Sequence, residues 1–559
     1  MFLLLAAAAG AIQIPYVQTK LVNYISKRLS EATSYQISIN RINIDWFDQV
    51  ELEGLRVLDP FGNPMIEAKT VNINYKLKTL LEDPSLDDLY LNNAYVSLEK
   101  IKMGDSIVLN MDQFIRNLRN LNKKDRKKKT KTVAFTIGNI KLNETLFSYS
   151  DPFNDSVKIG FNYNRFSVSS ISADIQNFYS LGDTLSMHVL ELKGKDTTSD
   201  LSIDRLKTHF FYSNQAMKFN ELDLIVGKSR IKESVEFKYR KATDLRKFVS
   251  NVTINADLKN SLIHSNELGV FIPLFEEFSE YFELSGIYKG RINSLQIKDL
   301  DLKLSGGSII RGDARLVGLP IIDETFIDLD LTNSYAVTED LKKYLRERTY
   351  RRLAPLRNIG FNANFFGFVN DFVANGDFFT EYGRITSDIN LKLQEEVNNS
   401  SYRGALKMIN FDLGGYTSNE LFGKVTLDGK ISGKGFTLNQ ADFVLDGKID
   451  SIGLNDYVYH AIETNARFTK EFFEGDVKVN DPNLKLDLNG SIDVRGGVDF
   501  FNVRAKLDTA FLSKLNFTEE PVFISSDLNV NAQGLKVDNI LGMANFKNTT
   551  VRRGGQELI

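Results

Sequence analysis

The sequence predicts an all-β protein, an elongated antiparallel sheet that curls into a groove, with an N-terminal membrane-anchor helix and a few short covering helices. Apolar and polar residues alternate in run after run, so each strand has one apolar and one polar side. Short Asn-Asp, Asp-Gly and Gly-Lys-Ser turns separate the runs and favour antiparallel meanders over crossovers through helices. The chain also has 40 phenylalanines and 21 tyrosines but only 10 prolines, as long strands require.

Composition excludes several classes of protein. With 559 residues, 42% of them hydrophobic and 25% charged, the chain is typical of folded proteins rather than disordered ones. A net charge of -3 gives no overall basic field, so we expect no nucleic-acid partner. The absence of cysteine excludes disulfides and thiolate chemistry.

Residues 1–14 are apolar apart from Gln13. A cleaved signal peptide would begin with basic residues, and this run has none. The run is also shorter than the ~20 residues that span a membrane. We therefore interpret residues 1–14 as part of a transmembrane anchor whose first half is missing. The candidate anchor residues are Phe2, Leu3, Leu4, Leu5, Ile12 and Ile14.

Residues 15–34 are expected to form an amphipathic juxtamembrane helix. Its apolar positions recur at helical spacing and are Val17, Leu21, Val22, Ile25 and Leu29. Basic residues lie on the other side of this helix. The apolar stripe either lies at the membrane surface or caps the first strands of the sheet, and the two alternatives are compatible.

Residues 35–131 form the first predicted β module. Its alternation slips in phase at Asn40 and Arg41, which suggests a bulge, and turn residues fill 59–64. A short helix is predicted over 112–121, followed by the basic run 123–131. We interpret this run as a solvated loop, with contact to anionic lipid headgroups as the alternative.

Residues 132–559 form a repetitive β body. Helical pieces are expected over 267–282 and 338–352, and glycines recur near bends at 429, 433, 435 and 447. Because the alternation continues to Ile559 without a capping element, we interpret the chain as truncated at its C-terminus.

The apolar sides of these strands are the candidate lining of a lipid-binding groove. The candidate residues are Ile42, Ile44, Trp46, Val157, Ile159, Phe161, Leu222, Leu224, Val226, Val252, Ile254, Leu300, Leu302, Leu304, Phe361, Phe365, Val425, Leu427, Phe443, Leu445, Leu484, Leu486 and Leu488.

No catalytic or metal-binding motif is present in the sequence. The histidines His188, His209, His264 and His460 are isolated from one another along the chain. The segment 429–435 is rich in glycine and lysine but lacks the Lys-Ser/Thr ending of a phosphate loop. Carboxylates such as those at 442, 446 and 450 follow the polar phase of a strand and are expected to be solubilising charges. We therefore expect no enzyme activity, no cofactor and no metal.

Several segments resemble a known family in their order along the chain. These are 14–18 (Ile-Pro-Tyr-Val-Gln), 37–45, 57–62, 308–313, 367–374 and 411–414. Together they resemble the AsmA-like TamB proteins, the translocation and assembly module subunit, in the form found in Bacteroidetes. The resemblance spans nearly the whole chain, although no single segment is catalytic or diagnostic.

This resemblance implies a single-pass inner-membrane protein of Gram-negative bacteria whose β-taco body stands in the periplasm. It implies a TamA-like outer-membrane partner, met through a C-terminal domain that this chain lacks. Members of the family are linked to phospholipid transport and to assembly of outer-membrane proteins.

Two functions follow as hypotheses. In the first, phospholipid acyl chains pass between the membranes along the apolar groove. If roughly 30 to 40 strands stack at ~4.8 Å, the body extends on the order of 150 to 190 Å, as a periplasmic bridge requires. In the second, exposed strand edges template client strands and assist assembly or secretion of outer-membrane β-barrel proteins with TamA.

Overall fold

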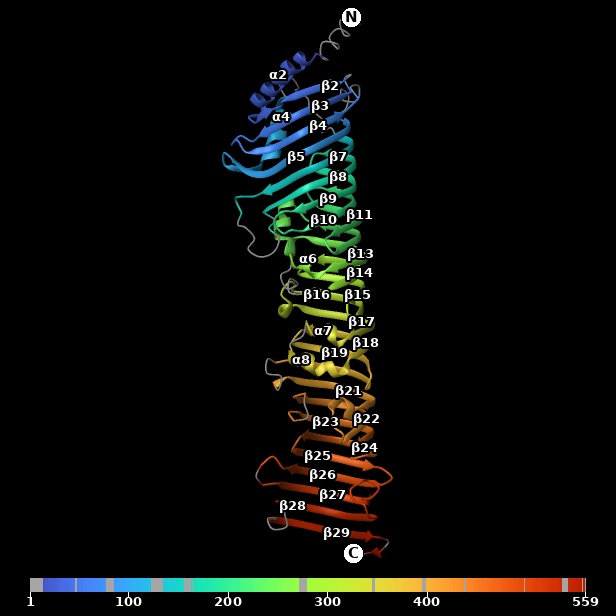
Figure 1. Cartoon of the computed structure of the whole chain (residues 1–559). Coiled ribbons are helices and arrows are strands. Elements are labelled where there is room, and N and C mark those ends of the chain that lie inside the picture. The colour runs from blue at the N-terminus through green and yellow to red at the C-terminus, as the bar shows by residue number, and fades with distance from the viewer. Residues whose placement is uncertain are drawn as a thin grey trace. The chain divides into compact units, whose positions relative to one another are not determined.

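The structure is a computed structural model of the chain. It describes residues 14–45, 48–76, 85–121, 134–154, 162, 164–270, 279–343, 347–394, 399–436, 439–496, 498–534, 541–554 and 556–557. The chain divides into two units, Met1–Ile292 and Asn293–Ile559, and each is described by itself. Both units consist mainly of strands, which confirms the all-β prediction (Figure 1).

Strands of the first unit pair with neighbours along the chain. They are β1 (Gln36–Ser38), β2 (Arg41–Asp45), β3 (Gln49–Leu58), β4 (Pro64–Asn74), β5 (Ser85–Met103), β6 (Ser106–Leu109), β7 (Phe135–Ser150), β8 (Arg165–Leu181), β9 (Thr184–Asp196), β10 (Ser202–Tyr212), β11 (Ala216–Val226), β12 (Ser229–Lys238), β13 (Thr253–His264) and β14 (Tyr281–Arg291). The helices are α2 (Pro15–Thr33), α4 (Asn110–Leu121), the 3-10 helix η2 (Ala242–Lys247), α5 (Phe248–Asn251) and α6 (Ser265–Gly269). From β7 to β14 every consecutive pair is antiparallel.

One pairing in the first unit departs from the predicted meander. Strands β5 and β7 are parallel, with Ser85 opposite Thr136 and Glu99 opposite Ser150. Strand β6 pairs with the end of β5 and α4 follows it, and residues 122–133, which precede β7, lie outside the described residues. A parallel pair cannot be joined by a short hairpin turn, so the prediction of an antiparallel sheet was wrong at this pair.

Helix α2 covers the first strands. Pro15 occupies its first turn, where a missing N–H costs nothing, and Ser34 ends it in the left-handed conformation. Its residues Val22 and Thr33 are buried, so the face with the apolar stripe packs on protein. The capping alternative therefore holds for this face of the helix. Among the described helices, none combines the length and apolar character that crossing a bilayer requires.

The phase slip at Asn40 and Arg41 is a break between two short strands. Both β1 and β2 pair with β3, β1 with residues 56–58 and β2 with residues 49–53. The Asn40 N–H donates to the Glu53 carbonyl (3.0 Å) between them. Both strands keep the same register on β3, so the slip divides one predicted strand into two, and the predicted bulge does not appear as a register shift.

Strands of the second unit form an antiparallel series in which each pairs with the next from β15 to β29. They are β15 (Ser294–Leu304), β16 (Ile309–Val317), β17 (Phe326–Val337), β18 (Asn358–Phe368), β19 (Asp371–Thr380), β20 (Gly383–Lys392), β21 (Ser401–Asp412), β22 (Phe422–Lys434), β23 (Asp442–Leu454), β24 (Tyr457–Thr469), β25 (Phe472–Asn480), β26 (Leu484–Asp493), β27 (Phe500–Phe511), β28 (Val522–Gln533), β29 (Leu541–Arg553) and β30 (Gln556–Glu557). Short helices interrupt the series at η4 (Ile322–Glu324), α7 (Thr338–Leu341), α8 (Glu347–Leu353), η5 (Ala354–Leu356) and α9 (Leu413–Thr417).

Of the three predicted helical segments, one is confirmed, one is divided into two helices and one was wrong at its end. The piece at 112–121 is confirmed as α4, and 338–352 is divided into α7 and α8. The piece at 267–282 was wrong at its end, because Tyr281 and Phe282 begin strand β14. The basic run 123–131 lies outside the described residues.

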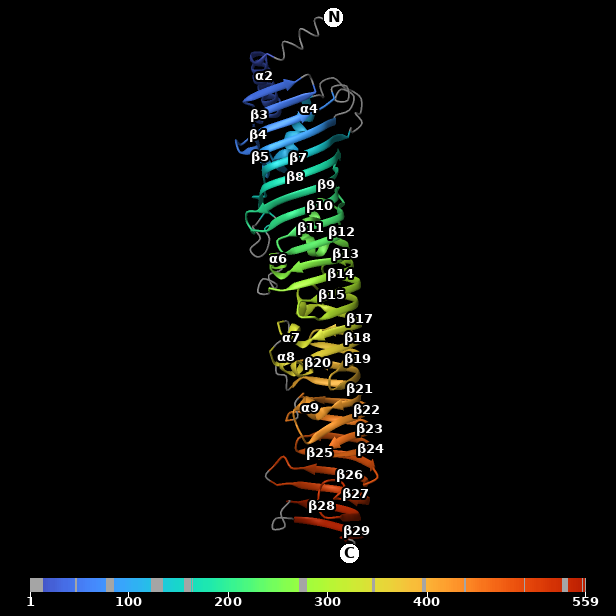
Figure 2. The same ribbon diagram turned by 45° about the vertical axis from the view of Figure 1, so that its right-hand side comes forward.

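The strands of the second unit follow one another along the sheet (Figure 2), and several of their glycines stand where neighbouring backbones approach closely. Gly475 has a φ of +144°, a conformation that residues with a side chain rarely adopt. A Cβ there would lie 2.3 Å from the Asn465 carbonyl oxygen and 2.5 Å from the Ala466 Cα. Gly447 faces Gly429, and a Cβ on Gly447 would lie 2.5 Å from the Gly429 Cα. The glycines predicted near bends thus stand where neighbouring backbones approach too closely for side chains.

Candidate functional site

The register of the second unit aligns its apolar residues in continuous rows. Directly opposed residues of paired strands lie on one face of the sheet. On β23, Phe443, Leu445, Gly447 and Ile449 belong to four successive rows, which we call the first to fourth rows. The second row takes one residue from every strand between β15 and β29: Ile297, Ala314, Leu329, Phe365, Ala374, Ile389, Gly404, Ile431, Leu445, Ala466, Gly475, Gly490, Val503, Val530 and Ala544.

The fourth row is equally apolar over ten consecutive strands. It consists of Phe361, Phe378, Ile385, Met408, Leu427, Ile449, Ile462, Val479, Leu486 and Leu507, and the next member, on β28, is Ser526. Together with the second row it gives the second unit one apolar face.

The third row, between them, carries small residues over β18 to β24 except at Leu406. Its members there are Ala363, Gly376, Ser387, Leu406, Gly429, Gly447 and Thr464. Larger side chains follow from β25 onward, at Val477 and Leu488. The glycines on this row stand where neighbouring backbones approach too closely for a Cβ.

The predicted lining residues of the second unit fall on this apolar face. Phe365 and Leu445 lie on the second row, Leu300 and Leu488 on the third, and Leu486 on the fourth. Phe443 lies on the first row, and Phe361 and Leu427 lie on the fourth. The others occupy further positions of the same face, and they are Leu302, Leu304, Val425 and Leu484.

Most of these side chains are only half-buried. Val425 and Leu445 are buried, at 2% and 8% exposure, whereas the remaining predicted lining residues of this unit keep an intermediate exposure. A face sealed by a second sheet would bury nearly all of them. The main packing partners of each described strand are its two neighbours in the sheet, with short helices adding contacts at β17 and β22. The apolar side chains of intermediate exposure therefore keep part of their surface accessible.

The opposite face of the second unit is mainly polar and exposed, although Phe366 and Val444 are also exposed on it. One row on it, from β16 to β29, is exposed throughout and consists of Asp313, Asp330, Asn364, Asn375, Asp388, Ala405, Lys430, Asp446, Asn465, Asp476, Asn489, Arg504, Asn529 and Asn545. Exposed pairs such as Lys448–Glu463 (3.0 Å) lie on the same face. Pairs of this kind add little stability, so this face mainly provides solubility.

The first unit has an equivalent apolar face. One row runs from β2 to β12 as Ile42, Leu52, Val71, Leu91, Leu142, Ala173, Leu192, Leu206, Leu224 and Ile231. Of the predicted lining residues, Ile42 and Leu224 lie on this row, and Ile44, Val226 and Ile254 lie on neighbouring rows of the face.

Other predicted residues are placed differently. Leu222 and Val252 are buried, at 6% and 0% exposure, and Val252 precedes β13 rather than lying within it. Trp46, Val157, Ile159 and Phe161 lie outside the described residues, as do all the candidate anchor residues except Ile14.

The long strands β7, β8 and β9 form a buried cluster within the first unit. Ile137, Ile140, Ile171, Ala173, Ile175 and Val189 are all less than 10% exposed, and half-buried neighbours such as Leu142 and Phe178 pack against them. At these strands the protein's own side chains occupy the apolar face, which the sequence alternation alone did not reveal.

The structure brings together two histidines that are isolated in the sequence. His188 and His209 are opposed on β9 and β10, and their rings stack at 3.9 Å between centroids. His209 Nε2 lies 3.8 Å from a Glu221 carboxylate oxygen. Within the described parts of the chain, no three His, Asp, Glu or Cys side chains come together in a way that could hold a metal ion. The pairing depends on strand register, which the spacing of the two histidines did not indicate.

The shifted pKa values of the tyrosines and carboxyl groups named below are caused by burial and by ion pairs. Burial, followed by repulsion from Asp59, raises the pKa of Tyr35 to about 12. Burial and then Asp442 raise the pKa of Tyr402 to about 12. Hydrogen bonds from Arg230 hold the pKa of Asp223 below its usual value. Each shifted group named here has a structural partner or a burial cause, and they do not converge as an acid–base pair would.

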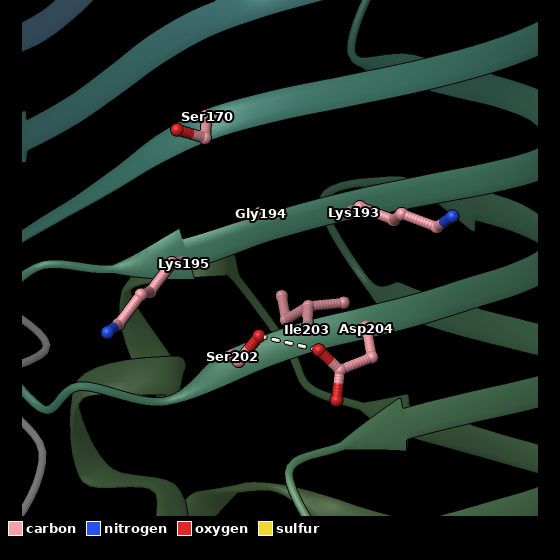
Figure 3. Close-up of a pocket in the computed structure, with 7 residues that line it drawn as sticks. All are labelled: Ser170, Lys193, Gly194, Lys195, Ser202, Ile203 and Asp204. Carbon is pink, nitrogen blue, oxygen red and sulfur yellow. Dashed lines mark hydrogen bonds between the residues drawn. The ribbon is translucent and has the colours of Figure 1, made fainter.

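One hollow of about 420 Å³ lies where bulges interrupt strands β8 to β10 (Figure 3). It is lined by Ser170, Lys193, Gly194, Lys195, Ser202, Ile203 and Asp204. The two lysines extend in different directions, and each is paired with a carboxylate, Lys193 with Glu191 and Lys195 with Asp200. Its polar groups do not converge, so the continuous apolar face remains the best candidate functional site.

Comparison of this chain with protein-family models, with curated proteins and with solved structures finds no match.

Proposed function

We propose that this protein is a membrane-anchored conduit of the AsmA-like TamB type that carries phospholipids between the inner and outer membranes of a Gram-negative cell. In this proposal the curled sheet is an elongated groove in the periplasm, and acyl chains lie along its apolar face. A TamA-like protein is the outer-membrane partner, and no catalytic step takes place on the chain.

The observation that carries the proposal is the unbroken second row on the apolar face of the second unit. Its second row contains only apolar side chains and glycine across fifteen paired strands. An acyl chain makes no hydrogen bonds, so its ideal surface is a long strip with no polar group left unpaired. The half-buried state of Leu427, Leu486 and Leu488 supports the same conclusion, because their remaining surface is available to a ligand.

The hydrophobic free energy gained when an acyl chain is buried on this face is large enough for reversible binding. Each methylene removed from water contributes about 0.8 kcal/mol, so even partial burial of a long acyl chain supports stable association. The contact is uniform along the rows, and no single position must hold the ligand. Movement along the face then needs no large barrier at any one strand.

The test uses a photo-crosslinking amino acid at Leu486 in the full-length protein in cells. The matched control places the same amino acid at Asp487, which is adjacent in sequence but exposed on the polar face. We expect phospholipid adducts at Leu486 and none at Asp487, measured by mass spectrometry of the purified protein.

Two outcomes would overturn the proposal. Equal lipid capture at both positions would show that adducts report random encounter. Capture only of outer-membrane protein strands at Leu486, without lipid, would favour the assembly function instead.

A further inference from the structure

Helix α2 presents an exposed face that carries alternating tyrosine and basic residues. Tyr16, Lys20, Tyr24 and Arg28 follow one another at intervals of four, which places them on one side of a helix. Tyr16 is 69% exposed and Tyr24 is 62% exposed, and the Lys20 ammonium lies 5.5 Å from the centre of the Tyr16 ring. We call these four residues the tyrosine–basic stripe.

The opposite side of α2 is held by the protein, so the stripe cannot turn inward. Val22 is 2% exposed, and the Asn117 side-chain amide on α4 donates to the Thr33 carbonyl (2.6 Å). The Ile37 N–H donates to the Ser30 hydroxyl (2.8 Å), which ties the helix to β1. Within the first unit, α2 is the outermost element next to β1 and β2 (Figures 1 and 2).

This arrangement determines which side chains of α2 are exposed and could contact a membrane. Of its apolar stripe, Val22 is buried and the other four residues are half-buried, and α2 contacts β1, β2 and α4. What remains outside is a polar stripe of large aromatic rings and positive charges. The helix has three basic residues and one acidic residue, although the chain as a whole has a net charge of -3.

We propose that the tyrosine–basic stripe rests on the headgroup layer of an anionic bilayer and sets how the first unit meets the membrane. Tyrosine suits this depth because its ring is apolar and its hydroxyl remains in water, and lysine and arginine pair with lipid phosphates. The stripe directly follows the apolar run 1–14 in the sequence. The inference rests on the membrane location in the proposed function, but it assigns the contact to named side chains.

A single-cysteine probe tests the contact, because the chain has no native cysteine. Tyr24→Cys is labelled with an environment-sensitive NBD dye in the full chain and reconstituted with vesicles of three parts phosphatidylcholine and one part phosphatidylglycerol. Lys448→Cys, on the exposed polar face of the second unit, is the matched control. We expect emission at position 24 to shift to the blue and to rise at least about two-fold, with no change at position 448.

Charge reversal then tests the basic residues. In the labelled protein, Lys20→Glu with Arg28→Glu is expected to remove most of the emission change, and Lys20→Gln with Arg28→Gln to reduce it. Raising the salt concentration is expected to act in the same direction as the glutamine variant. Unchanged circular dichroism would establish that each variant is folded.

An unchanged probe at position 24 in protein that floats with the vesicles would overturn the inference. A full emission change in the folded glutamate variant would also overturn it, since the basic residues would then be unnecessary. These outcomes can be distinguished from a failure of the proposed function, because that failure would appear as the absence of lipid adducts at Leu486.

Discussion

Strands β7–β9 of the first unit and β18–β24 of the second share the same alternation of apolar and polar residues. Their apolar faces differ in side-chain size and in burial. In β7–β9 the inward residues are bulky, such as Ile140 and Ile175, and they bury one another to less than 10% exposure. In β18–β24 the third row is mostly Gly, Ala, Ser or Thr, and flanking residues such as Leu427 stay half-buried. The two regions therefore differ in the volume of their inward side chains and in how many of these side chains stay half-buried.

The largest expected effect comes from placing a charge on each face. Ile175→Glu puts a carboxylate inside the buried cluster, where it has no partner, so we expect a loss of about 3–5 kcal/mol of stability. Leu486→Glu keeps its carboxylate within reach of water, and we expect a loss of about 1 kcal/mol together with poorer lipid capture. Denaturant unfolding followed by circular dichroism measures both losses.

Lys485→Glu serves as the control because Lys485 is exposed on the polar face next to Leu486. We expect it to leave stability nearly unchanged. Should Leu486→Glu destabilise the protein as much as Ile175→Glu, the two regions are equally sealed and the groove proposal fails at that strand.

A second, smaller effect tests the glycines of the second unit that stand where neighbouring backbones approach closely. Gly475→Val combines a strained φ with a Cβ 2.3 Å from the Asn465 carbonyl oxygen, so we expect a loss of about 2–3 kcal/mol. Gly496→Ala is the control, since the nearest atom to a Cβ there is 3.8 Å away. Denaturant midpoints compare the two variants. Equal midpoints for both would mean that this close approach does not require glycine.

The smallest expected effect concerns Glu99, in the first unit near α4. Burial, followed by repulsion from Asp59, raises the pKa of Glu99, although Arg165 opposes the shift. A carboxyl with a raised folded-state pKa destabilises the fold when it is ionised, and this cost disappears as pH falls below its ordinary value of 4.5. Glu99→Gln should therefore raise the melting temperature by at most about 2 °C at pH 7, and by nothing near pH 4.

Glu463→Gln is the comparison for this pH test. A hydrogen bond from Lys448 lowers the pKa of the exposed Glu463 carboxyl, which is the opposite direction. Thermal melts of both variants at the two pH values check the sign. A gain for Glu99→Gln that persists at pH 4 would trace to packing rather than to ionisation.

Much of the candidate face could be predicted from alternation alone. Leu484, Leu486 and Leu488 were assigned to the apolar side of one strand, and their register partners lie on the same side. The assignment worked because successive side chains of a strand point to opposite faces, whatever the strand pairs with. The same rule placed the carboxylates of Asp442, Asp446 and Asp450 on the polar face of β23.

Features that depend on register or on packing could not be predicted in this way. Local spacing does not encode which residue of one strand meets which residue of the next. The stacked pair of His188 and His209 and the opposed glycines at 429 and 447 therefore emerged only from the structure. The parallel pairing of β5 with β7 was missed for the same reason, since it joins strands that are not consecutive along the chain.

The sequence by itself determined that this protein is a succession of strands with one apolar and one polar side, because that property is local. Tertiary structure decided how much of each apolar side stays accessible, since exposure depends on the volumes of residues brought together from several strands. It also decided the role of α2. The apolar stripe of that helix fits a membrane or a sheet equally well, and only the fold assigns it to the sheet and leaves the tyrosines and basic residues outside.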